Sequence, residues 1–182
     1  MKKQGWFGVL VLLLAVLTAC KNETKSVKTR EIDPAVLQES LLEANKQVVK
    51  TEDDQIRDLI VRYKWDMHET GTGLRYFIYH KGNGSEAKKD KIARINFEIR
   101  LITGDIVYSS RESGVKEFKI GSGGVESGLE EGILLLRVGD KAKFIMPSHL
   151  AYGLIGDQDR IPAKSTLIYN VELLELKDSR KK

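Results

Sequence analysis

Alternation of apolar and polar residues is the clearest pattern along the chain. Every second residue from 93 to 101 is apolar, and these residues are Ala93, Ile95, Phe97, Ile99 and Leu101. The residues between them are charged or polar. Alternation of this length predicts a strand with one buried face and one wet face, as in an antiparallel sheet.

Shorter segments of the same kind predict further strands. They lie at residues 74–80, 106–109, 118–120, 142–146 and 166–176. The first of them also fits an arm that crosses between two strands. A short helix is expected at residues 128–136, because Leu129, Ile133 and Leu136 share a helical face. With a long irregular loop at 150–165, the pattern predicts four or five antiparallel strands around one helix.

Apolar residues at helical spacing precede this sheet. Asp33 and Pro34 are typical of a helix start, with an N-cap residue followed by proline at the first helical position. The apolar stripe that follows is Leu37, Leu41, Ala44 and Val48. Thr51, with Asp54 three residues on, resembles a capping box that opens a second helix. The face of that helix is Ile56, Leu59, Ile60 and Tyr63. These stripes can be covered within the chain or by a second copy, as a homodimer through the arm.

The start of the chain has the features of an export signal. Lys2 and Lys3 precede an apolar run at residues 6–17, which ends at Ala19-Cys20. A positive start, a short apolar run and a small-residue exit make a secretory signal, and the run is shorter than the roughly 20 residues of a spanning helix. A cysteine after a small residue resembles the bacterial lipobox, in which the thiol is diacylated and the signal is removed. The alternative is an ordinary signal or short anchor with a structural cysteine.

These patterns divide the chain into five parts. They are a lipoprotein signal peptide at 1–19, a polar tether at 20–32, an arm of two helices at 33–70, a main domain at 71–176 and a charged tail at 177–182. Lipidation of Cys20 would tie the chain to a membrane surface without spanning it. Because no aspartate follows Cys20, bacterial sorting rules favour the periplasmic face of the outer membrane.

Charge and candidate chemistry exclude several classes of function. The net charge of +4 falls to +2 without the two lysines of the signal, and basic residues are interspersed with acidic ones. A nucleic-acid partner would need basic residues gathered on one face, so none is expected. The three histidines are scattered and the sole cysteine is the expected lipid acceptor, so neither a zinc site nor a covalent nucleophile is expected. We also expect no cofactor.

Five segments carry a family resemblance. They are VESGLEEG at 125–132, VGDKA at 138–142, LAYG at 150–153, IP at 161–162 and LIYNVELL at 167–174. In this order and spacing they resemble the FKBP-type peptidyl-prolyl cis-trans isomerases, over roughly residues 74–176. The resemblance implies an α+β fold, a curled antiparallel sheet around one short helix, with proline-containing polypeptides as clients. The anchor and leading helices also resemble the gliding-motility-associated isomerase lipoproteins of Bacteroidetes.

The resemblance further implies an apolar pocket for the proline ring. Phe97 would form one wall, and Leu129 the floor, at a position where many members have tryptophan. Tyr169 would close the back of the pocket, and Ile161 would cover it from the long loop. Plain packing in the core is the alternative for each of them.

Polar contacts to the client are implied at three more positions. Val125 and the backbone N–H of Glu126 would bind the chain beside the proline, and Tyr152 would donate its hydroxyl to a client carbonyl. Such a pocket needs no acid or base, because rotation about the bond is resisted by amide resonance, with a barrier of about 18–20 kcal/mol. A dry apolar pocket favours the twisted amide, which has less charge separation than the planar one.

Four pocket positions depart from the family pattern. Tyr108 replaces an aspartate, so a buried carboxylate is expected to be missing, and Val107 replaces a phenylalanine. Lys116 and Arg160 replace apolar lining residues, which makes the rim more polar. Together they predict a reduced isomerase rate or an altered sequence preference, and weak binding of macrolide inhibitors.

The function expected is therefore a membrane-anchored prolyl isomerase that assists the folding of exported or envelope proteins. A role in gliding motility is implied by the narrower resemblance. The alternatives are a peptide-binding chaperone that is catalytically weak and a structural subunit of an envelope machine.

Overall fold

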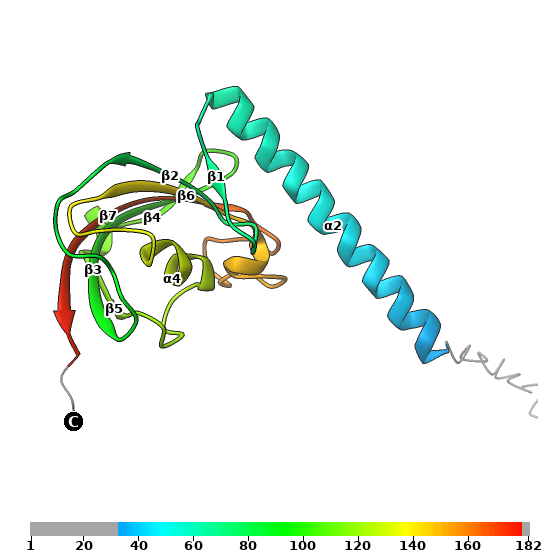
Figure 1. Cartoon of the computed structure of the whole chain (residues 1–182). Coiled ribbons are helices and arrows are strands. Elements are labelled where there is room, and N and C mark those ends of the chain that lie inside the picture. The colour runs from blue at the N-terminus through cyan, green and yellow to red at the C-terminus, as the bar shows by residue number, and fades with distance from the viewer. Residues whose placement is uncertain (1–32, 180–182) are drawn as a thin grey trace, which may run out of the picture. The chain divides into compact units, whose positions relative to one another are not determined.

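The structure is a computed structural model that describes residues 33–179 (Figure 1). The expected signal peptide, Cys20 and tether lie outside the described residues, as do the last three residues of the expected tail. The chain divides into two compact units between Leu41 and Leu42. The contacts given below between helix and sheet are those of the second unit.

Within the described residues, seven antiparallel strands form one sheet. They are β1 His68–Glu69, β2 Arg75–His80, β3 Lys91–Leu101, β4 Ile106–Ser109, β5 Lys116–Lys119, β6 Lys141–Met146 and β7 Leu167–Asp178. The order is β1-β2-β6-β7-β3-β4, and β5 also pairs with β3. The predicted number of four or five strands is wrong, because β1 adds a short strand and β2 pairs along β6 as a regular strand.

Strand β3 is the centre of this sheet and confirms the alternation in the sequence. Ala93, Ile95, Phe97 and Ile99 are buried, and the residues between them are partly exposed. Strand β3 pairs with β7 over its whole length. Because β7 continues to Asp178, the first two residues of the expected tail belong to the sheet.

The sheet curls around the short helix α4, Ser127–Ile133 (Figure 1). Leu129 and Ile133 are fully buried, as their spacing predicts. Gly132 allows a close approach to β6, since a Cβ there would lie 2.6 Å from the ring of Phe144. The predicted α+β class, with an antiparallel sheet around a short helix, is confirmed. The remaining short elements are α3, Ser110–Ser113, and the 3-10 helix η1, Ser148–Leu150.

One helix, α2 Pro34–Tyr63, stands where two were expected. Its start agrees with the sequence, because the Asp33 carboxylate accepts a hydrogen bond from the backbone N–H of Ala35 at 2.9 Å. Thr51 does not cap a second helix. Its hydroxyl donates to the backbone carbonyl of Gln47 at 2.9 Å, one turn earlier within the helix. Neither glycine nor proline interrupts residues 35–63, so nothing ends the helix midway.

The second half of α2 covers the outer face of the sheet. Ile56 and Leu59 are buried in a cluster with Ile145 of β6 and Ile168 of β7. This contact explains why β7 is apolar on both faces at this point. No helix within residues 33–179 combines the length and hydropathy that crossing a bilayer requires.

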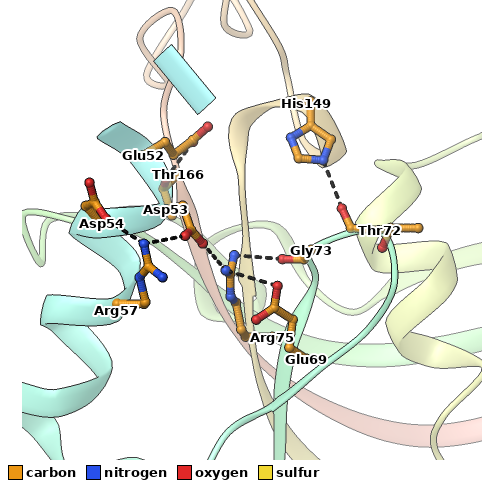
Figure 2. A network of polar contacts seen from close by, with 10 residues as sticks. All are labelled: Glu52, Asp53, Asp54, Arg57, Glu69, Thr72, Gly73, Arg75, His149 and Thr166. Atoms are coloured by element: carbon orange, nitrogen blue, oxygen red, sulfur yellow. Dashed lines mark hydrogen bonds and ion pairs between the residues drawn. The ribbon is translucent and has the colours of Figure 1, made fainter. Parts of the chain in front are cut away.

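A polar network fixes α2 beside this apolar contact (Figure 2). The buried carboxylate of Glu52 accepts hydrogen bonds from the backbone N–H of Ser148 at 2.6 Å, from the Ser148 hydroxyl at 2.9 Å and from the Thr166 hydroxyl at 2.6 Å. Next to it, the buried Arg75 guanidinium pairs with Asp53 and donates to the carbonyl of Gly73 at 3.0 Å. The helix is therefore attached to the residues that flank the long loop.

Candidate active site

The pocket residues expected from the sequence gather where the sheet meets α4. Five of them are buried in one apolar cluster: Phe97, Val107, Leu129, Ile161 and Tyr169. Three more are partly buried against it: Tyr108, Val125 and Tyr152. They come from strands β3, β4 and β7, from helix α4 and its entry, and from the long loop. The fold thus brings together residues that are widely separated in sequence.

Glu126 contributes its side-chain carboxylate to the site, in addition to the backbone N–H that the family resemblance implies. Its side chain is 4% exposed, just before α4. Its Oε1 accepts hydrogen bonds from the hydroxyls of Tyr152 at 2.6 Å and Tyr169 at 2.5 Å. The expectation that the pocket lacks a buried carboxylate is therefore wrong. The carboxylate is absent at position 108 but is supplied at position 126.

Lys116 faces the same carboxylate from β5. Its Nζ lies 3.7 Å from Oε2 of Glu126 and 5.5 Å from the centre of the Phe97 ring. Within residues 33–179, Oε2 of Glu126 is buried and accepts no hydrogen bond. The ammonium group is therefore close enough for charge attraction but is outside hydrogen-bond distance.

Burial and charge pull the Glu126 pKa in opposite directions. Burial acts to raise the pKa, but the charge of Lys116 and the hydrogen bonds from Tyr152 and Tyr169 outweigh it and hold the pKa below its ordinary value. Burial, together with the adjacent carboxylate, raises the pKa of both tyrosine hydroxyls well above the ordinary value. At neutral pH, Glu126 is thus ionised and accepts hydrogen bonds from the neutral hydroxyls of Tyr152 and Tyr169.

Tyr108 fastens the long loop instead of supplying a carboxylate. Its hydroxyl lies within hydrogen-bond distance of Oδ2 of Asp157 and 3.1 Å from Oδ2 of Asp159. The hydrogen bond to Asp157 is the main cause that raises the pKa of Tyr108 to about 12. Oδ1 of Asp157 also accepts a hydrogen bond from the backbone N–H of Ile161 at 2.7 Å. These bonds place Ile161 in the buried cluster.

Arg160 forms part of the rim. Its guanidinium donates to the backbone carbonyl of Val107 at 2.9 Å and to the carboxylate of Glu112 at 3.1 Å. It also lies 5.3 Å from the centre of the Tyr108 ring. The predicted polar rim is thus present, and Arg160 connects the long loop to β4 through it.

This combination of groups suits binding of an apolar ring beside a polar chain. The walls are apolar, while the Glu126 carboxylate, the two tyrosine hydroxyls and the Lys116 ammonium provide the polar groups. Among residues 33–179, no group of three or more histidine, cysteine or carboxylate side chains could hold a metal ion. Lys116 at a normally apolar position was the signal in the sequence for a charged group here, and nothing local pointed to the side chain of Glu126 as its partner.

Comparison with known proteins identifies the family. The family model for FKBP-type peptidyl-prolyl cis-trans isomerase matches residues 83–174. Peptidyl-prolyl cis-trans isomerase FKBP15-1 of Arabidopsis thaliana is 40% identical over 110 residues, which are 60% of this chain and 71% of that protein. The chain belongs to the family of FKBP-type peptidyl-prolyl cis-trans isomerases.

One bacterial relative extends the similarity beyond this domain. A probable FKBP-type isomerase of Haemophilus influenzae is 30% identical over 159 residues, or 87% of this chain and 65% of that protein. Probable isomerase FkpA of Neisseria meningitidis serogroup B is 37% identical over 59% of this chain and 39% of that protein. The chain therefore spans less than two thirds of the length of either relative.

A solved structure has a similar fold. The crystal structure of FkpA from Escherichia coli matches with a TM-score of 0.64 at 26% identity, covering 94% of this chain and 83% of that one. The expected FKBP-like fold is confirmed.

Proposed function

We propose that this chain catalyses cis–trans isomerisation of peptide bonds that precede proline, in exported or envelope proteins. The observation that carries the proposal is the burial of Phe97, Leu129 and Tyr169 in one cluster, against which the partly buried Val125 and Tyr152 pack, inside the region that matches the family. The proline ring would enter between these apolar side chains.

The rate increase would come from the surroundings of the amide. The twisted amide of the transition state separates less charge than the planar amide, so an apolar environment stabilises it relative to water. Hydrogen bonds to the flanking carbonyls would hold the chain while the bond rotates. A tenfold acceleration requires about 1.4 kcal/mol of differential stabilisation, which is within the reach of one such hydrogen bond.

The test is the rate of cis-to-trans conversion of succinyl-Ala-Leu-Pro-Phe-para-nitroanilide. The full chain is used in detergent micelles, and micelles with an unrelated lipoprotein are the control. We expect the rate to increase linearly with the concentration of the chain. A rate equal to that of the control would refute the enzymatic part of the proposal.

A peptide-binding chaperone with weak turnover is the second candidate. It is supported by the hydroxyl of Tyr152, which is already bonded to Glu126, and by Tyr108 in place of an aspartate. If this candidate is correct, the double substitution Val107→Phe with Tyr108→Asp should increase turnover, while client binding by the unchanged chain persists without it. A double variant with unchanged turnover would count against it.

We further propose that lipidation of Cys20 anchors the chain to the cell envelope, on the periplasmic face of the outer membrane. The proposal is supported by the signal-like residues 1–19, by the cysteine after a small residue and by Lys21-Asn22 behind it. A contribution to gliding motility, or a structural place in an envelope machine, is supported by the sequence resemblance of the anchored chain alone. Proline-containing polypeptides delivered across the inner membrane would be its clients.

A homodimer through the helical arm is also proposed. Leu41 and Leu42 of α2 are each 55% exposed, and Val49 is similarly exposed. Exposed apolar residues of this number on one helix are typical of an interaction surface. A second copy is the partner that would always be present at the same membrane.

A further inference from the structure

A client in this pocket needs a hydrogen-bond donor, and the tyrosine that the resemblance assigns to this task is engaged. A phenol has one O–H group, and that of Tyr152 points to Oε1 of Glu126 at 2.6 Å. Hydrogen bonds to a carboxylate are stronger than those to a neutral carbonyl. A client carbonyl would therefore compete poorly for this hydroxyl as long as Glu126 is ionised.

Lys116 is a second donor at the same place. An ammonium group has three N–H donors. Among the described residues, Nζ of Lys116 makes an ion pair with Glu126 at 3.7 Å and lies over the ring of Phe97. Its side chain is 29% exposed, so a bound chain can reach it. Its N–H groups are thus placed at the wall of the pocket without a hydrogen bond to Glu126.

Three groups hold the ammonium in this position. The Glu126 carboxylate attracts it, and the face of the Phe97 ring favours a cation. The backbone of Lys116 is fixed because it pairs with Ile95 in the sheet. The carboxylate is in turn held by the hydroxyls of Tyr152 and Tyr169. This chain of contacts begins at buried Tyr169 and ends at the partly exposed ammonium.

We propose that Lys116 donates a hydrogen bond to a backbone carbonyl of the client beside the proline, and that Glu126 is the residue that positions it. This inference rests on the proposed isomerase function. The task that the resemblance gives to Tyr152 passes to Lys116, and Tyr152 and Tyr169 act through the carboxylate. Lys116, which departs from the apolar pattern, and Glu126 then form one functional unit.

The experiment compares substitutions in the full chain in detergent micelles. The variants are Lys116→Met, Lys116→Arg, Glu126→Gln, Tyr152→Phe and, as a matched control in the same strand, the exposed Lys119→Met. For each we measure kcat/KM for succinyl-Ala-Leu-Pro-Phe-para-nitroanilide, the Kd of the same peptide by nuclear magnetic resonance titration, and the melting temperature.

We expect Lys116→Met to lower kcat/KM and weaken peptide binding by about tenfold or more, the loss typical of a charged hydrogen bond. Lys116→Arg should retain most of the activity, because arginine keeps the charge and the donors. Glu126→Gln should fall between them, and Tyr152→Phe should lose no more than about threefold. Lys119→Met should match the unchanged chain.

If Lys116→Met unfolds the chain because Glu126 loses its ion-pair partner, the double variant Lys116→Met with Glu126→Gln is used instead. It removes both charges, so no unpaired charge is left buried. Full activity in Lys116→Met or in the folded double variant would overturn the inference, and so would a tenfold loss in Tyr152→Phe, which would give the task to Tyr152. A chain that binds the peptide without isomerising it refutes the proposed function, and the Kd values then decide the role of Lys116. A chain that does neither refutes both.

Discussion

Glu126 shows how a single residue can change the character of an apolar pocket. Its carboxylate is buried, yet the Lys116 charge and two tyrosine hydroxyls keep it ionised. Paired and hydrogen-bonded charges of this kind are stable only as complete networks, since loss of one member leaves the others buried without partners. The tyrosines, the carboxylate and the ammonium therefore act as one unit.

Replacing Glu126 with glutamine should reveal the charge of this unit in the pH dependence of stability. The folded chain holds the Glu126 pKa below the value of about 4.3 in unfolded chains, so the ionised group stabilises the fold above that pH. This stabilisation is lost as pH falls through the folded pKa. We expect Glu126→Gln to lower the free energy of unfolding by about 2 kcal/mol at pH 7 and by much less at pH 3, measured by urea denaturation.

The control for this prediction is Glu39→Gln, on the exposed surface of α2. Its stability should follow that of the unchanged chain at both pH values. A deficit of Glu126→Gln that stays constant, or grows, from pH 7 to pH 3 would contradict the assigned charge.

At the scale of elements, α2 is joined to the main domain by both apolar and polar contacts. Ile56 and Leu59 provide the apolar part, and Glu52 provides three hydrogen bonds to Ser148 and Thr166. A buried carboxylate with three donors cannot be removed without leaving those donors unsatisfied.

Glu52→Ala should therefore destabilise the domain by about 3 kcal/mol. The reason is that buried donors of Ser148 and Thr166 lose their acceptor (Figure 2 labels Glu52 and Thr166). Thermal and urea unfolding measure the loss. Asp58→Ala, an exposed position on the same helix, should change stability by less than about 0.5 kcal/mol. Equal effects of the two substitutions would show that the network contributes little.

The elements also show what the sequence can and cannot predict. Strands β3, β6 and β7 were predictable because burial on one face repeats every second residue, which is a local pattern. The break in the arm was predicted wrongly, since Thr51 has the residue type of a cap but bonds within an unbroken helix. The pairing of Glu126 with Tyr152 and Tyr169 spans 26 and 43 residues. Only the fold brings those side chains together, so no local pattern could reveal it.

At the scale of the whole molecule, the proposed dimer rests on the exposed apolar residues of α2. The double substitution Leu41→Gln with Leu42→Gln should convert a dimer into a monomer. Glutamine side chains are well solvated by water in the monomer, so their burial between two copies no longer favours association. Sedimentation in detergent measures the mass. Isomerase activity should be unchanged, since neither residue belongs to the pocket. A chain that sediments as a monomer before substitution would contradict the proposed dimer.

The proposed attachment to the envelope gives a second prediction at this scale. Cys20→Ala should move the chain from the membrane fraction to the soluble fraction of cells, because a residue without a thiol cannot carry the acyl chains. Fractionation followed by immunoblotting measures the distribution. Thr18→Ala, two residues before Cys20, is the control and should stay with the membrane. An unchanged distribution of Cys20→Ala would refute lipidation at this residue.

The contact of Glu52 with both Ser148 and Thr166 has a topological consequence. Glu52 accepts hydrogen bonds from both ends of the segment that carries Tyr152 and Ile161, a segment that the pairing of Met146 with Leu167 already closes into a loop. A closed loop has far fewer conformations than a free segment of equal length. The arm thus adds a second closure, outside the sheet, to the loop that carries Tyr152 and Ile161.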